Sequence, residues 1–134
     1  MGLAAALVTL YTGYVGFLFF TQSFPNLPTY YVWAIRLGIL IFVLFSFQGF
    51  LMGSRMNHSV GALNNNSNWF IVGWNKTFGD LGVAHFIGMH ALQVLPFLYF
   101  YIFKNTKSTI LISLLYEVLA MFYILSSFAR KTFF

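Results

Sequence analysis

The chain of 134 residues contains no cysteine, two acidic residues and three prolines. Without a thiol it forms no disulfide, no thiolate metal site and no cysteine nucleophile. Charged residues make up 7% of the sequence, whereas soluble domains carry about 25% because their surface must be solvated. A chain this poor in charge cannot cover a soluble surface, so its composition excludes an ordinary globular domain.

Apolar residues fill the place of the missing charge. Hydrophobic residues make up 60% of the chain and aromatic residues 22%, and the mean hydropathy is +0.80. The net charge of +5 comes from only seven Lys and Arg, which suits membrane topology better than a nucleic-acid footprint. We therefore expect a lipid bilayer, and no nucleic acid, as the partner of this surface.

Four apolar runs are each close to the ~20 residues that cross a ~30 Å hydrocarbon layer. They cover residues 2–20, 30–52, 81–103 and 109–128, and a polar loop covers residues 53–79. Helices are the expected spanning form, because every backbone polar group in lipid needs an internal partner. Short turns after the first and third runs imply two antiparallel hairpins. The sequence thus predicts one all-α transmembrane domain over residues 1–134, an integral membrane four-helix bundle.

The basic residues give a weak indication of orientation. Residues on the side of the long loop are Arg55, Lys76, Arg130 and Lys131, whereas Lys104 and Lys107 lie on the opposite side with Arg36 just inside it. Cytoplasmic loops carry an excess of Lys and Arg. We therefore expect both termini in the cytoplasm.

Two ionisable side chains, His90 and Glu117, fall near the middle of apolar runs. At ~1.5 Å of rise per residue, each lies ~14–15 Å from its own end of the helix and so at similar depth. Gln93 shares a helical face with His90, and the long side chain of Arg36 points toward the same level. We therefore expect Arg36, His90, Gln93 and Glu117 to form one intramembrane polar cluster.

Three interpretations of this cluster stay open. In a structural one, Arg36 pairs with Glu117 while His90 and Gln93 hydrogen-bond between helices. In a functional one, Glu117 and His90 relay protons or ions near neutral pH. In the third, the cluster lines a pocket for a ligand or cofactor.

A second set of polar residues lies at the side of the long loop. His58, Asp80 and His85 together suit Zn or non-haem iron, because imidazole and carboxylate supply the lone pairs that these metals need. Asp80 is also placed as the N-cap of the third helix, and His58 reads equally as a solvated loop residue. His85 and His90 diverge by ~140° around a helix and do not readily share one metal. Bis-histidine haem ligation is a further alternative.

Residues 79–96 read GDLGVAHFIGMHALQVLP. This segment resembles the stretch GDLRVxHFxGxHAxQxLP of an uncharacterised family of bacterial multispanning membrane proteins. The chain has Gly82 where the family pattern has Arg. The resemblance implies a bacterial inner-membrane location and a longer protein of which this chain is a C-terminal part, but it carries no activity. The residues that it groups into one set are His58, Asp80, His85, His90 and Gln93.

The sequence therefore favours a small polytopic membrane protein that serves as a binding or transport-related module, as a homo-oligomer or as a subunit of a larger membrane complex. The alternative is a membrane-embedded redox enzyme that depends on a metal ion or haem. The sequence names no substrate, and it leaves open whether the protein is an enzyme.

Overall fold

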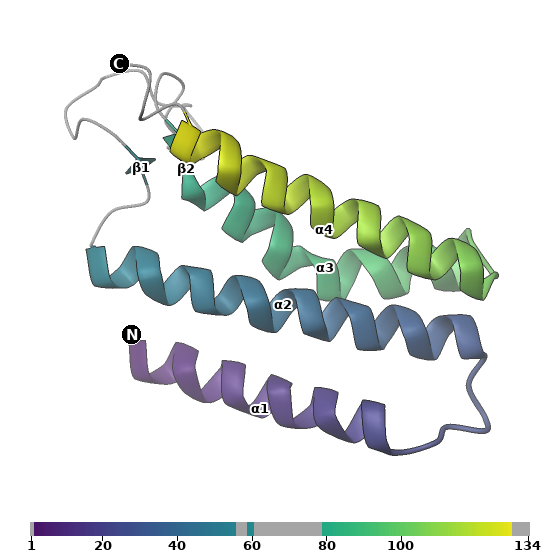
Figure 1. Ribbon diagram of the computed structural model, residues 1–134. Helices are drawn as coiled ribbons and strands as arrows, with labels where there is room; N and C mark the ends of the chain where they lie inside the picture. Colours follow the sequence, from purple (N-terminus) through teal and green to yellow (C-terminus); the bar gives the residue numbers. More distant parts are fainter. Residues whose placement is uncertain (1, 56–58, 61–78, 130–134) are drawn as a thin grey trace.

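The computed structural model describes residues 2–55, 59–60 and 79–129, and its main elements are four helices (Figure 1). These are α1 (Gly2–Thr21), α2 (Thr29–Arg55), α3 (Leu81–Tyr101) and α4 (Thr106–Ala129). Two short strands, β1 (Ser59–Val60) and β2 (Gly79–Asp80), pair antiparallel beside the start of α3. All four helices are long and apolar enough to cross a membrane. The predicted all-α four-helix membrane fold is confirmed.

The helix ends differ from the predicted ones by at most three residues, and a local hydrogen bond accounts for the earlier start of α4. Asp80 caps α3 as expected, because its carboxylate accepts from the Gly82 N–H at 2.7 Å. The side chain of Asn105 accepts from the Lys107 N–H at 2.9 Å, so α4 begins at Thr106 instead of residue 109. The helix α2 takes in the first three residues of the predicted loop, 53–55.

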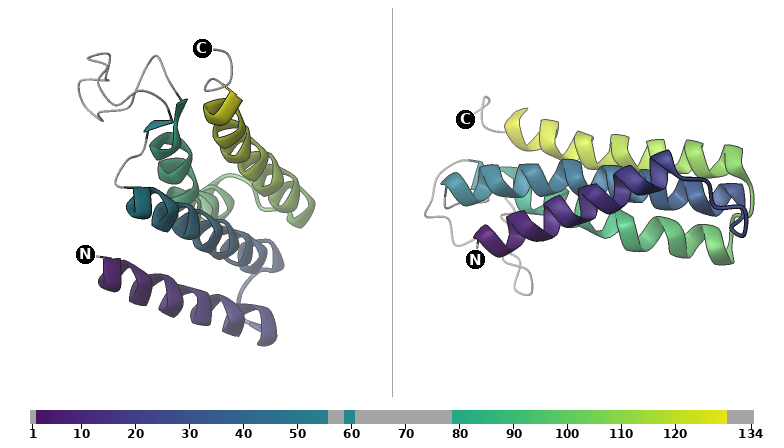
Figure 2. Two further views of the ribbon diagram at one scale, coloured as in Figure 1. Left: turned by 60° about the vertical axis from the view of Figure 1, so that its left-hand side comes forward. Right: turned by 90° about the horizontal axis from the view of Figure 1, so that it is seen from below.

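Successive helices run in opposite directions (Figure 1). The start of α1, the end of α2, the start of α3 and the end of α4 therefore share one end of the molecule. The helix α2 contacts all three of the others, whereas α1 packs chiefly on α2. Figure 2 shows α1 crossing α2 obliquely. The bundle thus consists of a packed α2–α3–α4 unit with α1 laid against one side.

Small residues bring α2 and α3 close together. A Cβ added to Gly38 of α2 would lie 3.2 Å from the Leu92 Cα of α3, and a Cβ on Gly88 would enter the ring of Phe45. In lipid, where apolar surface gains little from association, such close backbone packing is a main source of helix–helix stability. The buried core consists of Ala34, Ile41, Phe45, Ala84, Ala91, Leu95, Tyr99 and Ala120.

Hydroxyl groups hold α4 to α3. The Tyr116 hydroxyl donates to the Ile87 carbonyl at 2.6 Å, near the middle of both helices. At one end, the fully buried Tyr99 hydroxyl lies 3.2 Å from the carbonyls of Ser108 and Thr109. Each carbonyl oxygen has two lone pairs, so it can accept from a tyrosine as well as from its own helix. These bonds satisfy hydroxyl groups that lipid cannot hydrogen-bond.

The glycine packing gives a direct test. We expect Gly88→Ala to lower the free energy of unfolding by about 1–3 kcal/mol, because the new methyl group overlaps the Phe45 ring. The matched control is Gly13→Ala in α1, whose Cβ would make an ordinary 3.9 Å contact with Val43. Unfolding by denaturing detergent, followed by circular dichroism, measures both. Equal effects of the two substitutions would contradict the proposed packing.

Candidate functional site

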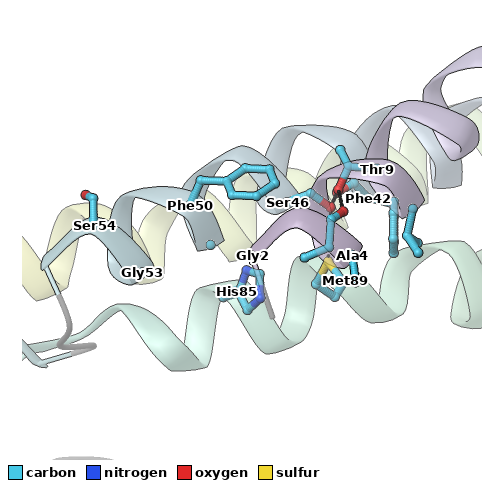
Figure 3. Close-up of a pocket in the computed structure, with 13 residues that line it drawn as sticks. Gly2, Ala4, Thr9, Phe42, Ser46, Phe50, Gly53, Ser54, His85 and Met89 are labelled. Atoms are coloured by element: carbon cyan, nitrogen blue, oxygen red, sulfur yellow. Dashed lines mark hydrogen bonds between the residues drawn. The ribbon is translucent and has the colours of Figure 1, made fainter.

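A partly open cleft of about 790 Å³ lies between α1, α2 and α3 (Figure 3). Most of its surface is apolar, and among the described residues that line it His85 is the single titratable side chain. The helices contribute their halves nearest the shared end of the bundle. The lining residues are Gly2, Ala4, Ala5, Val8, Thr9, Phe42, Ser46, Gly49, Phe50, Gly53, Ser54, His85 and Met89.

The cleft exists because α1 packs tightly on α2 at one end only. At Gly16, an added Cβ would lie 2.6 Å from the Ile39 side chain, so the two helices are in close contact there. Toward its start, α1 presents Gly2, Ala4 and Ala5 to the cleft. Their small side chains leave the space between the obliquely crossing helices partly unfilled. The result is a cavity instead of a packed interface.

His85 is held in one orientation against α2. Its Nδ1 lies 2.8 Å from the Phe45 carbonyl oxygen. A carbonyl only accepts, so Nδ1 carries the proton and donates. The ring lies against Gly49, where an added Cβ would collide with the imidazole Cε1. The absence of a side chain at Gly49 therefore makes room for the histidine between the two helices.

The other polar side chains of the cleft are bonded to their own helices. The hydroxyls of Thr9 and Ser54 donate to main-chain carbonyls of the preceding turn, at 2.9 Å and 2.8 Å. Ser46 lies 2.8 Å from the Phe42 carbonyl and 3.3 Å from the sulfur of Met89. In the described part of the chain, the His85 Nε2 atom makes no hydrogen bond. It is the polar atom most free to meet a bound molecule.

Arg36, expected in the intramembrane cluster, binds the end of α1 instead. Its Nε donates to the Phe19 carbonyl at 2.7 Å, and one Nη is 3.4 Å from the Gln22 carbonyl. The guanidinium also lies 5.6 Å from the ring centre of Phe20 and 5.4 Å from that of Trp33. A cation is favourable at a helix C-terminus, where main-chain carbonyls are unsatisfied. Arg36 thereby fastens α1 to α2.

The other three members of the expected cluster are divided between two helices, with His90 and Gln93 on α3 and Glu117 on α4. The His90 Nδ1 donates to the Phe86 carbonyl of its own helix at 2.6 Å, and Gln93 is exposed. Glu117 lines a shallow groove formed by residues of α4. Among the described residues, no hydrogen bond or ion pair joins any two of Arg36, His90, Gln93 and Glu117. Equal depth places residues at one level, but it does not turn them toward one another.

The metal set predicted at the loop side is not shown by the structure. Asp80 uses its carboxylate to cap α3, and its carbonyl accepts from the Ser127 hydroxyl at 3.3 Å. His85 turns toward α2, and His58 lies outside the described residues. Within residues 2–55, 59–60 and 79–129, no group of three His, Cys, Asp or Glu side chains is placed to hold a metal ion.

Comparison of the chain with protein-family models, curated proteins and solved structures finds no match.

The sequence does carry a signal for this cleft. Polar or small residues recur along one face of α2 at spacings of three and four, namely Ser46, Gly49 and Gly53. His85 and Met89 stand four apart and so share a face of α3. Such a stripe inside apolar helices marks either close packing or a polar-lined cavity, and only the crossing of α1 decides between them.

The position of Arg36 gives a second prediction. We expect Arg36→Met to lower the free energy of unfolding by about 1.5–3 kcal/mol, because it removes hydrogen bonds from a charged donor. Combined with Glu117→Gln, the effects should add within about 0.5 kcal/mol, since no hydrogen bond or ion pair joins the two residues in the described part of the chain. Unfolding in detergent of the two single variants and the double variant measures the coupling. A coupling energy above about 1 kcal/mol would contradict this placement of Arg36 and support the Arg36–Glu117 ion pair expected from the sequence.

Proposed function

We propose that this small polytopic membrane protein is a binding module that holds a mainly apolar small molecule in the cleft between α1, α2 and α3. The observation that carries the proposal is the Nε2 of His85, which has no hydrogen-bond partner among the described residues and belongs to a ring whose other nitrogen is bonded to the Phe45 carbonyl. Ligand sites are typically concave, apolar and about 300–1,000 Å³ in volume, with a few placed polar groups. A cleft of about 790 Å³ fits that description.

The surroundings of the cleft support a ligand that is soluble in lipid. The walls belong to helices that are apolar enough to cross a membrane. The helix α1 forms one wall of the cleft. It is the least buried of the four helices, with 11% of its span buried inside the protein. A molecule dissolved in the bilayer reaches the cleft by moving past α1, without crossing the packed α2–α3 interface. From the positive-inside rule we propose that this end of the bundle faces the cytoplasm.

A second candidate is the metal- or haem-dependent redox protein, and one observation favours it. Metal-binding histidines usually donate their other ring N–H to a carbonyl or carboxylate, as His85 does to Phe45. Met89, one turn further along α3, adds a thioether, which is a ligand for soft metals. An absorption spectrum and metal analysis of protein purified without chelators separate the two functions. A stoichiometric metal or a haem spectrum would replace the first proposal with the second.

The binding proposal is tested by filling the cleft. The probe is 4-octylphenol, and native mass spectrometry of the protein in phospholipid nanodiscs measures its saturable binding. We expect Ala5→Trp to weaken binding about tenfold or more, which is 1.4 kcal/mol or more, because the indole occupies the cavity. The control Leu3→Trp changes an exposed residue of α1 that does not line the cleft. Unchanged binding in Ala5→Trp would contradict the proposal.

A further inference from the structure

We infer that the ligand of the cleft carries a hydroxyl group that donates a hydrogen bond to the His85 Nε2, on an otherwise apolar body. A long-chain alcohol, a phenol or a hydroquinone head on an apolar tail has this chemistry. The inference rests on the proposed binding function and adds the polarity of the ligand to it. The polar side chains of the cleft have already donated their protons within the protein, so the donor has to come from the ligand.

The neighbour of Nδ1 determines where His85 carries its proton. The 2.8 Å contact with the Phe45 carbonyl requires the proton on Nδ1. Among the described residues that line the cleft, none carries a carboxylate. A neutral imidazole has one N–H, so Nε2 bears a lone pair and acts as an acceptor.

The hydroxyl groups beside the histidine already donate their protons to main-chain carbonyls. Thr9, Ser46 and Ser54 each have one hydroxyl proton, and each lies 2.8–2.9 Å from a carbonyl of its own helix. Their oxygen lone pairs remain, but their protons are used. The Met89 sulfur is also an acceptor. Every described polar side chain that lines the cleft therefore offers an acceptor, while its own proton is already donated.

A ligand that binds these side chains has to supply the hydrogen-bond donor itself. A carboxylate, phosphate or ether head brings only acceptors, so it loses its hydration without gaining a hydrogen bond from the His85 Nε2 or from the described side-chain hydroxyls of the cleft. A hydroxyl group supplies the missing donor and satisfies its own proton at Nε2. An unmade hydrogen bond in a low-dielectric site is costly, so the side chains select for the donor.

The test compares three probes that share one tail: 4-octylphenol, 4-octylanisole and 4-octylbenzoate. Native mass spectrometry in nanodiscs measures their binding to the unaltered protein. We expect the phenol to bind about three- to tenfold more tightly than the anisole, which has the same ring but no donor. The benzoate should bind no better than the anisole.

Two substitutions on α3 locate the effect. We expect His85→Phe to remove the preference for phenol over anisole, because it removes Nε2 and keeps a ring of similar size. The matched control is His90→Phe, which changes a histidine that does not line the cleft and should keep the preference. The comparison of probes on the unaltered protein decides the question even if His85→Phe does not fold.

The outcomes separate the two proposals. Equal binding of phenol and anisole, with both weakened by Ala5→Trp, would overturn the donor inference and leave the binding module in place. Stronger binding of the benzoate would also overturn it, since that requires free donors in the cleft. Absence of saturable binding for all three probes would overturn the binding module and the inference together.

Discussion

The close approach of α2 and α3 is the constraint on which both the core and the cleft depend. Gly88 lets the Phe45 ring pack against the α3 backbone, and Gly49 leaves room for the His85 ring in the same interface. Phe45 therefore has two roles, since its ring fills the core while its carbonyl fixes the histidine. In lipid this packing has to come from shape, because apolar side chains gain little by leaving one apolar medium for another.

The helix α1 has the opposite character at its two ends. Near its C-terminus, Gly16 allows tight contact with Ile39, and Arg36 binds the last carbonyls. Toward its start, small residues face the cleft and contribute little packing. One fixed end and one loosely packed end let a helix form the wall of a cavity without being separated from the bundle. The charge of Arg36 thus stabilises the frame of the site from outside it.

Run lengths and turn residues were sufficient to predict the helices, and the Asp80 cap followed from its place before an apolar run. The candidate site was only partly predictable. Depth along a helix follows from residue number, but the direction around the helix does not when apolar residues occupy every face. In the described part of the chain, no hydrogen bond or ion pair joins His90 and Glu117, although the sequence puts them at one level. His85 lies in a cleft that depends on the crossing of α1. Nothing in a single sequence fixes that crossing.

The orientation of His85 is tested most directly by ¹⁵N NMR of its imidazole in lipid, with His58→Gln and His90→Gln used to assign the ring signals. The hydrogen bond to Phe45 predicts a protonated Nδ1 and an unprotonated Nε2. It also predicts that the Nε2 signal shifts when 4-octylphenol is added and stays in place with 4-octylanisole. A proton on Nε2, or an Nε2 signal that does not respond to the phenol, would contradict the assignment of His85 as the acceptor of the cleft.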